Sequence, residues 1–328
     1  MSGELTFKLG ELRIALDEPA PDGRAEKSTL AYISHAHSDH TGALGGPAKI
    51  FCSDETAALI ALDAADRGPI PEGITLHNAG HMLGSTQIGM ATESHGKMVY
   101  TGDFKLRDGL TVKAAPVMQC DTLIAECTYG RPDVSFPNPE ETYADMERWQ
   151  KQNADNIQLW GAYSSGKGQE VVKFLNKYCS VVPIVGGKME KVCQAYCGAG
   201  VKLDYVGAGS EEAAEVMRGP FCSVMPPHHT GPALAHRVAS VHRRKAKVAL
   251  TTGWAMVRPL SCDAAFPLSD HADFGQLLEY CQQSGAKEVF VAHGENYKTA
   301  KALCEAGVNA YPIEQRLERQ TKLVVSEK

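Results

Sequence analysis

The sequence predicts an α/β protein built from two domains. Short apolar runs typical of β-strands alternate along the chain with segments whose apolar residues recur at helical spacing. The 328 residues, 43% hydrophobic and 22% charged, suit a soluble protein of one large or two modest domains. Several predicted strands also end in a single His, Asp or Glu, as expected where loops from one sheet edge converge on a site.

The N-terminal part of the chain predicts strands joined by loops, with a single helix. Residues 5–9 and 12–17 alternate apolar and polar side chains on either side of Gly10-Glu11, which predicts a β-hairpin. Two prolines, a glycine and several charges make residues 18–28 a loop. The remaining elements expected here are strands at 30–33, 50–52 and 74–77, and a helix over 54–65 that begins at Ser53 or Asp54.

Three later strands in this half are followed by residues that can bind metals or move protons. His81 lies between glycines in Gly-His-Met-Leu-Gly-Ser, directly after a strand. Asp103 ends the run Met-Val-Tyr-Thr-Gly-Asp, and Glu126 ends the run Leu-Ile-Ala-Glu. Each residue alone suits an ordinary polar turn. Their recurrence at strand ends indicates that they share one site.

Three prolines within residues 131–139 mark a domain boundary, beyond which helix and strand patterns alternate. This alternation predicts a second, inserted α/β domain. Gly166-Lys167-Gly168 is not a phosphate loop, because the upstream glycine of that motif is absent. The elements expected from here on are helices at 140–153, 168–178, 189–197, 274–284 and 297–305, and strands at 157–160, 181–185, 248–252, 288–292 and 308–311.

The strongest chemical signal is the segment at 34–42, Ser-His-Ala-His-Ser-Asp-His-Thr-Gly. Alternate side chains of an extended backbone point the same way, so His35 and His37 can bind one ion. Asp39 and His40 fall further on and can reach a second, adjacent ion. Imidazole and carboxylate together suit zinc or another borderline divalent metal. The alternative is a polar loop without a metal, but the full string is far more specific than a lone His-x-His.

Charge is distributed unevenly along the chain. The net charge of −6 does not indicate a nucleic-acid-binding protein. However, no acidic residue lies between Glu215 and Asp263, a stretch that we call the basic window. This asymmetry suggests a surface for an anionic polymer, the alternative being a solvated basic helix face. The basic residues of the window are Arg218, Arg237, Arg243, Arg244, Lys245, Lys247 and Arg258.

The cysteines and the N-terminal segment indicate the cellular compartment of the protein. The ten cysteines show no paired spacing that suggests a disulfide framework. Residues 1–6 lack the basic and apolar regions of a signal peptide, and the longest apolar runs fall far short of a membrane span. We therefore expect free thiols, a cytoplasmic location and no association with a membrane.

With these motifs, the chain resembles the β-CASP nucleases of the metallo-β-lactamase superfamily over nearly its whole length. Asp17 matches an aspartate near the metals, and the string at 34–42, His81, Asp103 and Glu126 match successive motifs. His271 in Ser-Asp-His-Ala-Asp and His293 in Ala-His-Gly-Glu match the two later histidines. The resemblance implies an αββα sandwich from residues 1–135 and 256–328, with a β-CASP domain inserted at 136–255.

The resemblance also implies a site with two divalent ions, zinc first and manganese as the alternative. Asp103 is the residue that bridges the ions. Asp39, His271 and Glu126 are the expected catalytic residues, with His271 as the acid that protonates the leaving oxygen and Glu126 orienting it. The expected ligands of one ion are His35, His37, His81 and Asp103, and those of the other are Asp39, His40, Asp103 and His293.

The function that follows is hydrolysis of nucleic acid, single-stranded or frayed at its ends. The stretch from Gly253-Trp254-Ala255 to His271 looks most like ligase-associated DNA exonucleases, which favours DNA over RNA, a role in repair and partners such as a DNA ligase. RNA-processing exo- or endoribonuclease activity is the alternative, since His293 is shared with RNA-cleaving members. Two further alternatives are a hydrolase of small esters or thioesters and a scaffold subunit without catalysis. The inserted domain, Glu126, His271 and the complete ligand set argue against these two.

Overall fold

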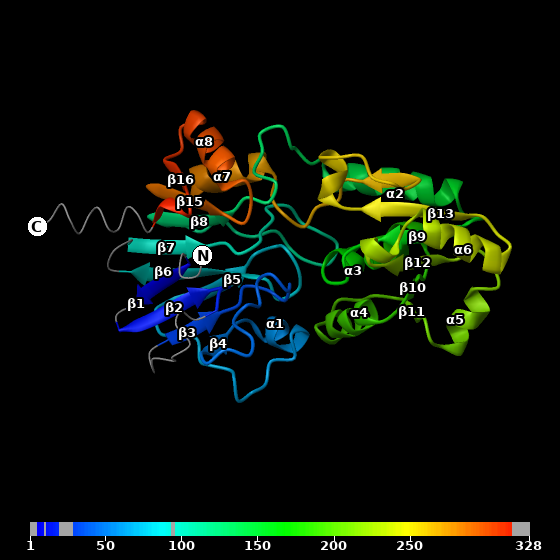
Figure 1. The fold of residues 1–328 in the computed structure, drawn as a ribbon, viewed down its shortest axis with the longest axis horizontal. Coiled ribbons are helices and arrows are strands. Elements are labelled where there is room, and N and C mark those ends of the chain that lie inside the picture. The colour runs from blue at the N-terminus through cyan, green and yellow to red at the C-terminus, as the bar shows by residue number, and fades with distance from the viewer. Residues whose placement is uncertain (1–4, 10, 20–28, 93–95, 317–328) are drawn as a thin grey trace, which may run out of the picture. The chain divides into compact units, whose positions relative to one another are not determined.

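The computed structural model describes residues 5–9, 11–19, 29–92 and 96–316, and the chain forms two compact units (Figure 1). Unit 1 comprises Met1–Asp108, Lys113–Ser135 and His271–Lys328, and unit 2 comprises Gly109–Val112 and Phe136–Asp270. The predicted first domain includes 109–112 and resumes at 256, whereas residues 109–112 and 256–270 group with unit 2. Residues 256–270 do so because β14 (Ala264–Phe266) pairs in parallel with β13 (Ala246–Thr251) of the unit 2 sheet.

The first sheet of unit 1 has the strand order β1-β2-β3-β4. β1 (Thr6–Leu9) and β2 (Leu12–Leu16) form the predicted antiparallel hairpin. β3 (Thr29–Tyr32) and β4 (Lys49–Phe51) extend the sheet in parallel. Strand β3 leads within two residues into the histidine-rich segment at 34–42.

The second sheet of unit 1 has the strand order β16-β15-β8-β7-β6-β5. Its antiparallel part is β5, β6 and β7, whereas β7, β8, β15 and β16 run parallel. Because parallel strands end at the same edge of a sheet, the residues that follow β7, β8 and β15 are brought together. The strand bounds are β5 (Ile74–Asn78), β6 (Thr86–Thr92), β7 (Gly96–Tyr100), β8 (Thr122–Glu126), β15 (Glu288–Ala292) and β16 (Ala310–Pro312).

The two sheets of unit 1 share one hydrophobic core, and helices cover their other faces. Each large side chain buried in such a core contributes about 1.5–3 kcal/mol. α1 (Asp54–Leu59) packs on the first sheet, and α7 (Phe274–Ser284) and α8 (Asn296–Glu305) pack on the second. The shared core contains Leu5, Phe7, Ile14, Leu16, Tyr32 and Phe51 from the first sheet and its flanks, with Ile88, Tyr100, Ile124 and Phe290 from the second.

Helix α1 begins where the sequence predicts but ends earlier. Ser53 caps its N-terminus by accepting a hydrogen bond from Thr56 N at 3.1 Å. The helix stops because Ala61 takes a left-handed φ of 50° and Leu62 N turns back to the carbonyl of Ala57 at 2.9 Å. The predicted helix over 54–65 is therefore wrong beyond Leu59, although apolar spacing continues past that point.

Unit 2 is built on a parallel sheet with the strand order β11-β10-β12-β9-β13-β14. The strand predicted over 181–185 is shorter, because Pro183 lacks the N–H that a strand ladder needs. The remaining bounds are β9 (Ile157–Gly161), β10 (Ile184–Val185), β11 (Val206–Gly207), β12 (Cys222–Met225), α2 (Pro139–Gln152), α3 (Lys167–Cys179), α4 (Lys188–Gly198), α5 (Glu211–Val216) and α6 (Pro232–His242), with short 3-10 turns η1 (Pro227–His229) and η2 (Gly253–Met256).

An aromatic cluster joins the helices of unit 2 to its sheet. Trp160 of β9 is fully buried, and its ring centroid lies 5.2 Å from Trp149 of α2. Phe174 of α3 and Phe266 of β14 each lie 5.9 Å from the same ring. These contacts fix the middle of α3 against β9.

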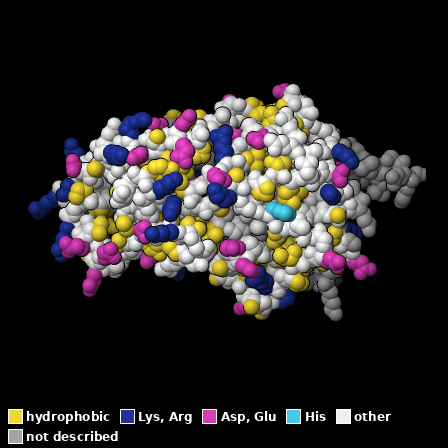
Figure 2. Space-filling view, turned by 180° about the vertical axis from the view of Figure 1, so that it is seen from behind, with side chains coloured by type: hydrophobic (Ala, Val, Ile, Leu, Met, Phe, Trp, Pro, Cys, Tyr) yellow, Lys and Arg dark blue, Asp and Glu magenta, His cyan; other side chains and the backbone are white. Residues whose placement is uncertain are grey.

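Among the residues that the structure describes, no helix is long and apolar enough to cross a membrane. On the face shown in Figure 2, Lys and Arg side chains lie among Asp and Glu, and hydrophobic side chains form separate patches. Both signs of charge are therefore mixed on this face.

Candidate metal centre

The residues of unit 1 that can bind metals or transfer protons lie at or just beyond the ends of strands. His35 and its neighbours follow β3, and His81 follows β5. Asp103 follows β7, Glu126 is the last residue of β8, and His293 directly follows β15. Since β7, β8 and β15 are parallel neighbours, these last three residues emerge at one edge of the second sheet.

Gly102 lets the Asp103 loop approach the histidine-rich segment. Its φ of 54° lies in the left-handed region that favours glycine. A Cβ placed on Gly102 would lie only 2.7 Å from the Cβ of Ser34. A side chain here would therefore push Ser34, and with it the adjacent His35, away from Asp103.

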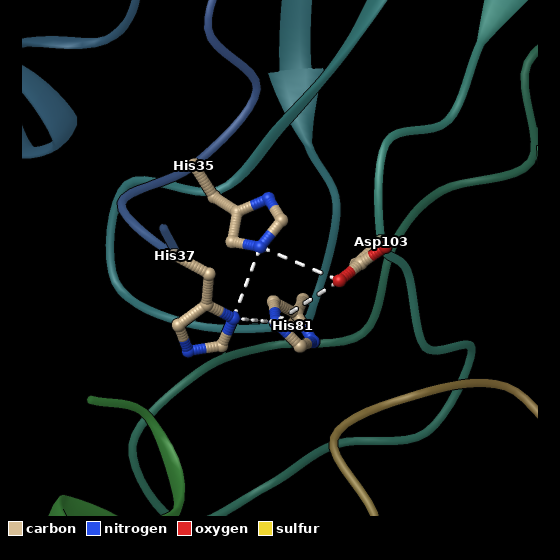
Figure 3. Close-up of side chains that lie close together, drawn as sticks. All are labelled: His35, His37, His81 and Asp103. Carbon is tan, nitrogen blue, oxygen red and sulfur yellow. Dashed lines mark hydrogen bonds and ion pairs between the residues drawn. The ribbon is translucent and has the colours of Figure 1, made fainter. Parts of the chain in front are cut away.

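Three imidazoles and one carboxylate converge beside this glycine (Figure 3). His37 Nδ1 lies 3.0 Å from His35 Nε2 and 3.0 Å from His81 Nε2. Asp103 Oδ2 lies 3.4 Å from His35 Nε2 and 3.7 Å from His81 Nε2. The four ligand atoms all lie within 4.8 Å of one another, so a single ion can contact all of them.

The electrostatics of this cluster suit a divalent cation. Burial lowers the pKa of His81 well below its usual range, and the rings of His271 and His35 lower it further, which favours the neutral form that binds metals. Burial raises the pKa of Asp103, but the rings of His40, His271 and His35 outweigh it and leave the pKa well below its usual range. Asp103 Oδ1 is buried without a hydrogen bond to any described residue. An ionised carboxylate beside the neutral imidazole of His81 fits zinc or manganese.

His40 lies on the other side of Asp103. Its Nε2 is 3.3 Å from Asp103 Oδ1, and its Nδ1 is 2.8 Å from Asp17 Oδ2. Burial lowers the pKa of His40, but the carboxylates of Asp103 and Asp17 outweigh it and raise the pKa well above its usual range. The two carboxylates beside His40 thus favour a positive charge there, and a cation bound by His40 would have to displace the proton from its ring.

The two other residues expected at a second ion lie near His40 without closing around it. Asp39 Oδ2 is 3.9 Å from His40 Nε2, and the Asp39 side chain is 78% exposed. The His293 ring centroid lies 4.9 Å from that of His40, and its Nε2 lies 3.0 Å from the Tyr100 hydroxyl. The first group of four is therefore compact, whereas the second is looser.

Asp17 organises the support behind His40. It accepts hydrogen bonds from Ser34 N at 2.7 Å, Ser34 Oγ at 2.6 Å and the Tyr100 hydroxyl at 2.7 Å. Its bond to His40 Nδ1 places the proton on that nitrogen and leaves Nε2 to face Asp103. Sequence patterns point to Asp17 but not to Ser34 or Tyr100, because their types carry no metal signal.

His271 and Glu126 form a separate pair next to the cluster. His271 Nδ1 lies 2.9 Å from Glu126 Oε1 and 3.8 Å from Asp103 Oδ2. The backbone holds Glu126 in turn, because its carboxylate accepts from Phe104 N at 3.3 Å and from Thr128 N at 2.9 Å. Glu126 is buried, whereas the His271 side chain is 22% exposed, so the ring can meet a substrate.

The chain is similar to several proteins whose names indicate action on nucleic acid. It is 33% identical over 303 residues to a probable DNA ligase from Opitutus terrae, covering 86% of this chain and 28% of that protein. It is 26% identical to an RNase J-like protein from Methanocaldococcus jannaschii, covering 53% of this chain and 48% of that protein. It is 24% identical to the 5' exonuclease Apollo from Gallus gallus, covering 52% of this chain and 40% of that protein.

The chain thus spans between about a quarter and a half of the length of these relatives. No protein-family profile matches it. A solved structure of a protein of unknown function from Enterococcus faecalis shares its fold, with a TM-score of 0.59 and 12% identity over 89% of this chain and 91% of that one.

Proposed function

This chain belongs to the β-CASP branch of the metallo-β-lactamase superfamily, and on that premise we propose that it is a metal-dependent nuclease that hydrolyses phosphodiester bonds. The observation that carries the proposal is the convergence of His35, His37 and His81 on Asp103, with the His271–Glu126 pair 3.8 Å from the same carboxylate. A thioester hydrolase has less need of this second pair, because a thiolate leaves more readily without a proton than the alkoxide of a nucleic acid does.

The site holds two divalent ions in this proposal, zinc first and manganese as the alternative. When bound, the two ions supply Lewis-acid activation of water and of the scissile phosphate. The first ion would be held by His35, His37, His81 and Asp103. The second would be held by Asp39, His40, Asp103 and His293, which lie near one another around His40.

His271 handles the proton of the leaving oxygen. Its Nδ1–H donates to Glu126 Oε1, so the ring presents Nε2 to the substrate. The Glu126 carboxylate stabilises the doubly protonated ring, and Nε2 then gives its proton to the departing ribose or deoxyribose oxygen. After that transfer, the neutral ring keeps its bond to Glu126 and takes a proton from water for the next cycle.

We also propose that unit 1 corresponds to the αββα sandwich of the superfamily and unit 2 to the inserted β-CASP domain. The support is that two sheets share one core in unit 1, while helices pack on the outer side of each sheet. A cytoplasmic location is consistent with ten unpaired cysteines. Burial raises the pKa of Cys127 to about 12, so this thiol stays protonated and unreactive.

We favour DNA as the substrate, in the role of an exonuclease that acts during repair beside a DNA ligase. The names of two relatives, a probable DNA ligase and a 5' exonuclease, support this choice. The RNase J-like relative supports RNA processing as the second candidate. Single-stranded or end-frayed nucleic acid is the form that we expect to bind.

The basic window supplies the contact with the phosphate backbone in this proposal. Arg237, Arg243 and Lys245 are exposed and make no ion pair with any described residue. Arg244 donates to the carbonyl of Asp155 at 3.1 Å, and Lys247 pairs with Asp263 at 2.7 Å. Cations without acidic partners are the ones available to phosphates.

One assay separates these candidates. Single-stranded DNA and RNA of the same sequence, labelled at either end, are incubated with the protein and manganese or zinc and resolved on a gel. We expect DNA to be shortened from one end, and the Asp103→Asn variant to leave it intact. Faster cleavage of RNA would select the second candidate. Hydrolysis of a small ester or thioester, with neither polymer cut, would overturn the proposal.

A further inference from the structure

Two buried side chains of opposite charge lie on the first turn of α3 in unit 2. Lys167 and Glu170 are 3% and 2% exposed, although such residues are almost never fully buried unless paired. Lys167 Nζ donates to Asp270 Oδ1 at 2.6 Å. Glu170 accepts from Leu110 N at 2.9 Å and from the Tyr143 hydroxyl. The first turn of α3 therefore holds two segments that are far apart in the sequence.

The Lys167–Asp270 pair has a consequence for the site because Asp270 is the residue before His271. The Asp270 side chain is only 11% exposed, so water screens the pair weakly. A short, charge-assisted hydrogen bond in such surroundings holds its partners in one geometry. The helix that carries Lys167 is itself fixed, since Phe174 packs on the buried Trp160.

The backbone after His271 is fixed separately, within unit 1. Ala272 N donates to the carbonyl of Phe104 at 2.7 Å, and Asp273 caps α7 by accepting from Gln276 N at 2.9 Å. His271 thus lies between two anchored residues, and Lys167 supplies the anchor on the N-terminal side. Glu126 then orients the ring from this fixed backbone.

Glu170 provides a contrast on the same helix turn. Its partner Leu110 lies in the loop that starts at Asp103. Two hydrogen bonds hold the part of this loop that lies between Asp103 and Leu110. Lys105 N donates to the carbonyl of Ala79 at 2.9 Å, and Leu106 N donates to Gln276 Oε1 at 2.9 Å. Loss of the Glu170 charge should therefore disturb unit 2 without moving His271.

We propose that Lys167 is a positioning residue for the cleavage reaction. By binding Asp270, it fixes the backbone that carries His271, so that Nε2 of the ring meets the leaving oxygen. The inference rests on the proposed function, in which His271 protonates that oxygen.

The test compares two substrates in full-length protein loaded with manganese. One substrate is single-stranded DNA, and the other is a nitrophenyl phosphodiester, whose leaving group needs no acid. Lys167→Met should slow cleavage of DNA ~10²-fold, the size expected for a misplaced catalytic group. The same variant should hydrolyse the nitrophenyl ester at close to the wild-type rate, with unchanged metal content. Asp270→Asn can still accept the hydrogen bond from Lys167 Nζ, so its rate of DNA cleavage should fall less.

Matched controls separate positioning from a general loss of stability. Glu170→Gln removes a buried charge from the same helix turn, and Lys177→Met makes the same substitution at an exposed position of α3. Neither should distinguish the two substrates. If Lys167→Met fails to fold, the double variant K167M/D270N removes the pair without leaving an unpaired charge and takes its place.

The outcomes distinguish this inference from the function on which it rests. The first case is that His271→Ala loses only DNA cleavage. A Lys167→Met variant that then loses activity equally on both substrates, or on neither, would contradict the positioning role. If His271→Ala itself fails to distinguish the two substrates, the assignment of the acid is wrong instead, and the inference about Lys167 falls with it.

Discussion

The two sides of Asp103 hold their histidines in different ways. On one side, His35, His37 and His81 point nitrogen atoms at one another across 3.0 Å, inside a mostly buried cluster. On the other side, His271 is 22% exposed and one of its nitrogens is tied to a carboxylate. Converging lone pairs suit a cation, whereas a partly exposed ring that is bonded to a carboxylate suits the delivery of a proton. In the proposed mechanism the same residue type therefore serves two purposes, which its surroundings decide.

Replacing Asp103 should have the largest effect on activity, because both the metal-binding side and the proton-donating side of the site depend on this residue. Asp103→Asn takes away the charge that faces His35, His40 and His81. We expect metal affinity to fall by more than the ~10²-fold that the loss of a supporting partner costs, and cleavage to fall to background. Elemental analysis and the DNA gel measure the two effects. His77→Ala, at an exposed position of β5, is the control, and retention of metal and activity by Asp103→Asn would refute the shared role.

Removing His271 should affect the proton-donating side alone. His271→Ala should keep its metal and cleave DNA ~10²–10⁴-fold more slowly, the usual contribution of a general acid. On a nitrophenyl phosphodiester it should approach wild type, whereas His293→Ala should be poor on both substrates and lose metal. Equal damage to both substrates with metal retained would mean that His271 binds phosphate and the proton has another source.

Weakening the support behind His40 should give an intermediate effect on the metal side. Asp17→Asn removes the negative charge and one of the two carboxylate oxygens behind His40, and we expect a ~10–100-fold loss of metal affinity. Competition with a chromophoric chelator measures it. Tyr100→Phe keeps the Asp17 carboxylate and removes the hydroxyl that donates to it and lies 3.0 Å from His293 Nε2, so it serves as the milder comparison. Unaltered affinity in Asp17→Asn would show that the tautomer of His40 does not depend on this carboxylate.

Changing the basic window should have the smallest effect and leave both sides of Asp103 intact. Arg243, Arg244 and Lys245 replaced together by glutamate should weaken binding to all sequences alike. The slope of log affinity against log salt should drop by ~0.7 for each lost contact with a single strand. Glutamates at the exposed Lys188, Lys191 and Lys202 of unit 2 give the same change in charge as a control. An unchanged slope would identify the window as an ordinary solvated surface.

Motifs with a distinctive spacing could be read from the sequence. The string at 34–42 and the single residues His81, Asp103 and Glu126 pointed to the family that the relatives confirm. The hairpin of β1 and β2 was also predictable, because alternation around a glycine is a strong local signal. Strand β6 was not, since its sequence Thr-Gln-Ile-Gly-Met-Ala-Thr shows little alternation and its burial comes from neighbouring strands.

The supporting contacts could not be read in the same way. Tyr100 and Ser34 act on Asp17 from distant parts of the chain, and their residue types suit any buried sheet. Lys167 pairs with Asp270 across 103 positions, so only the fold reveals the pair. The end of α1 at Leu59 depends on a left-handed residue, Ala61, which apolar spacing does not detect.

A metal titration tests most directly whether a two-ion site on Asp103 cuts nucleic acid. The protein is stripped with a chelator and reloaded stepwise with manganese or zinc, while bound metal and cleavage of end-labelled single-stranded DNA are measured together. Cleavage should rise until about two ions are bound per chain and then level off. Full cleavage with one tightly bound ion, and no gain on adding more, would contradict the two-ion site.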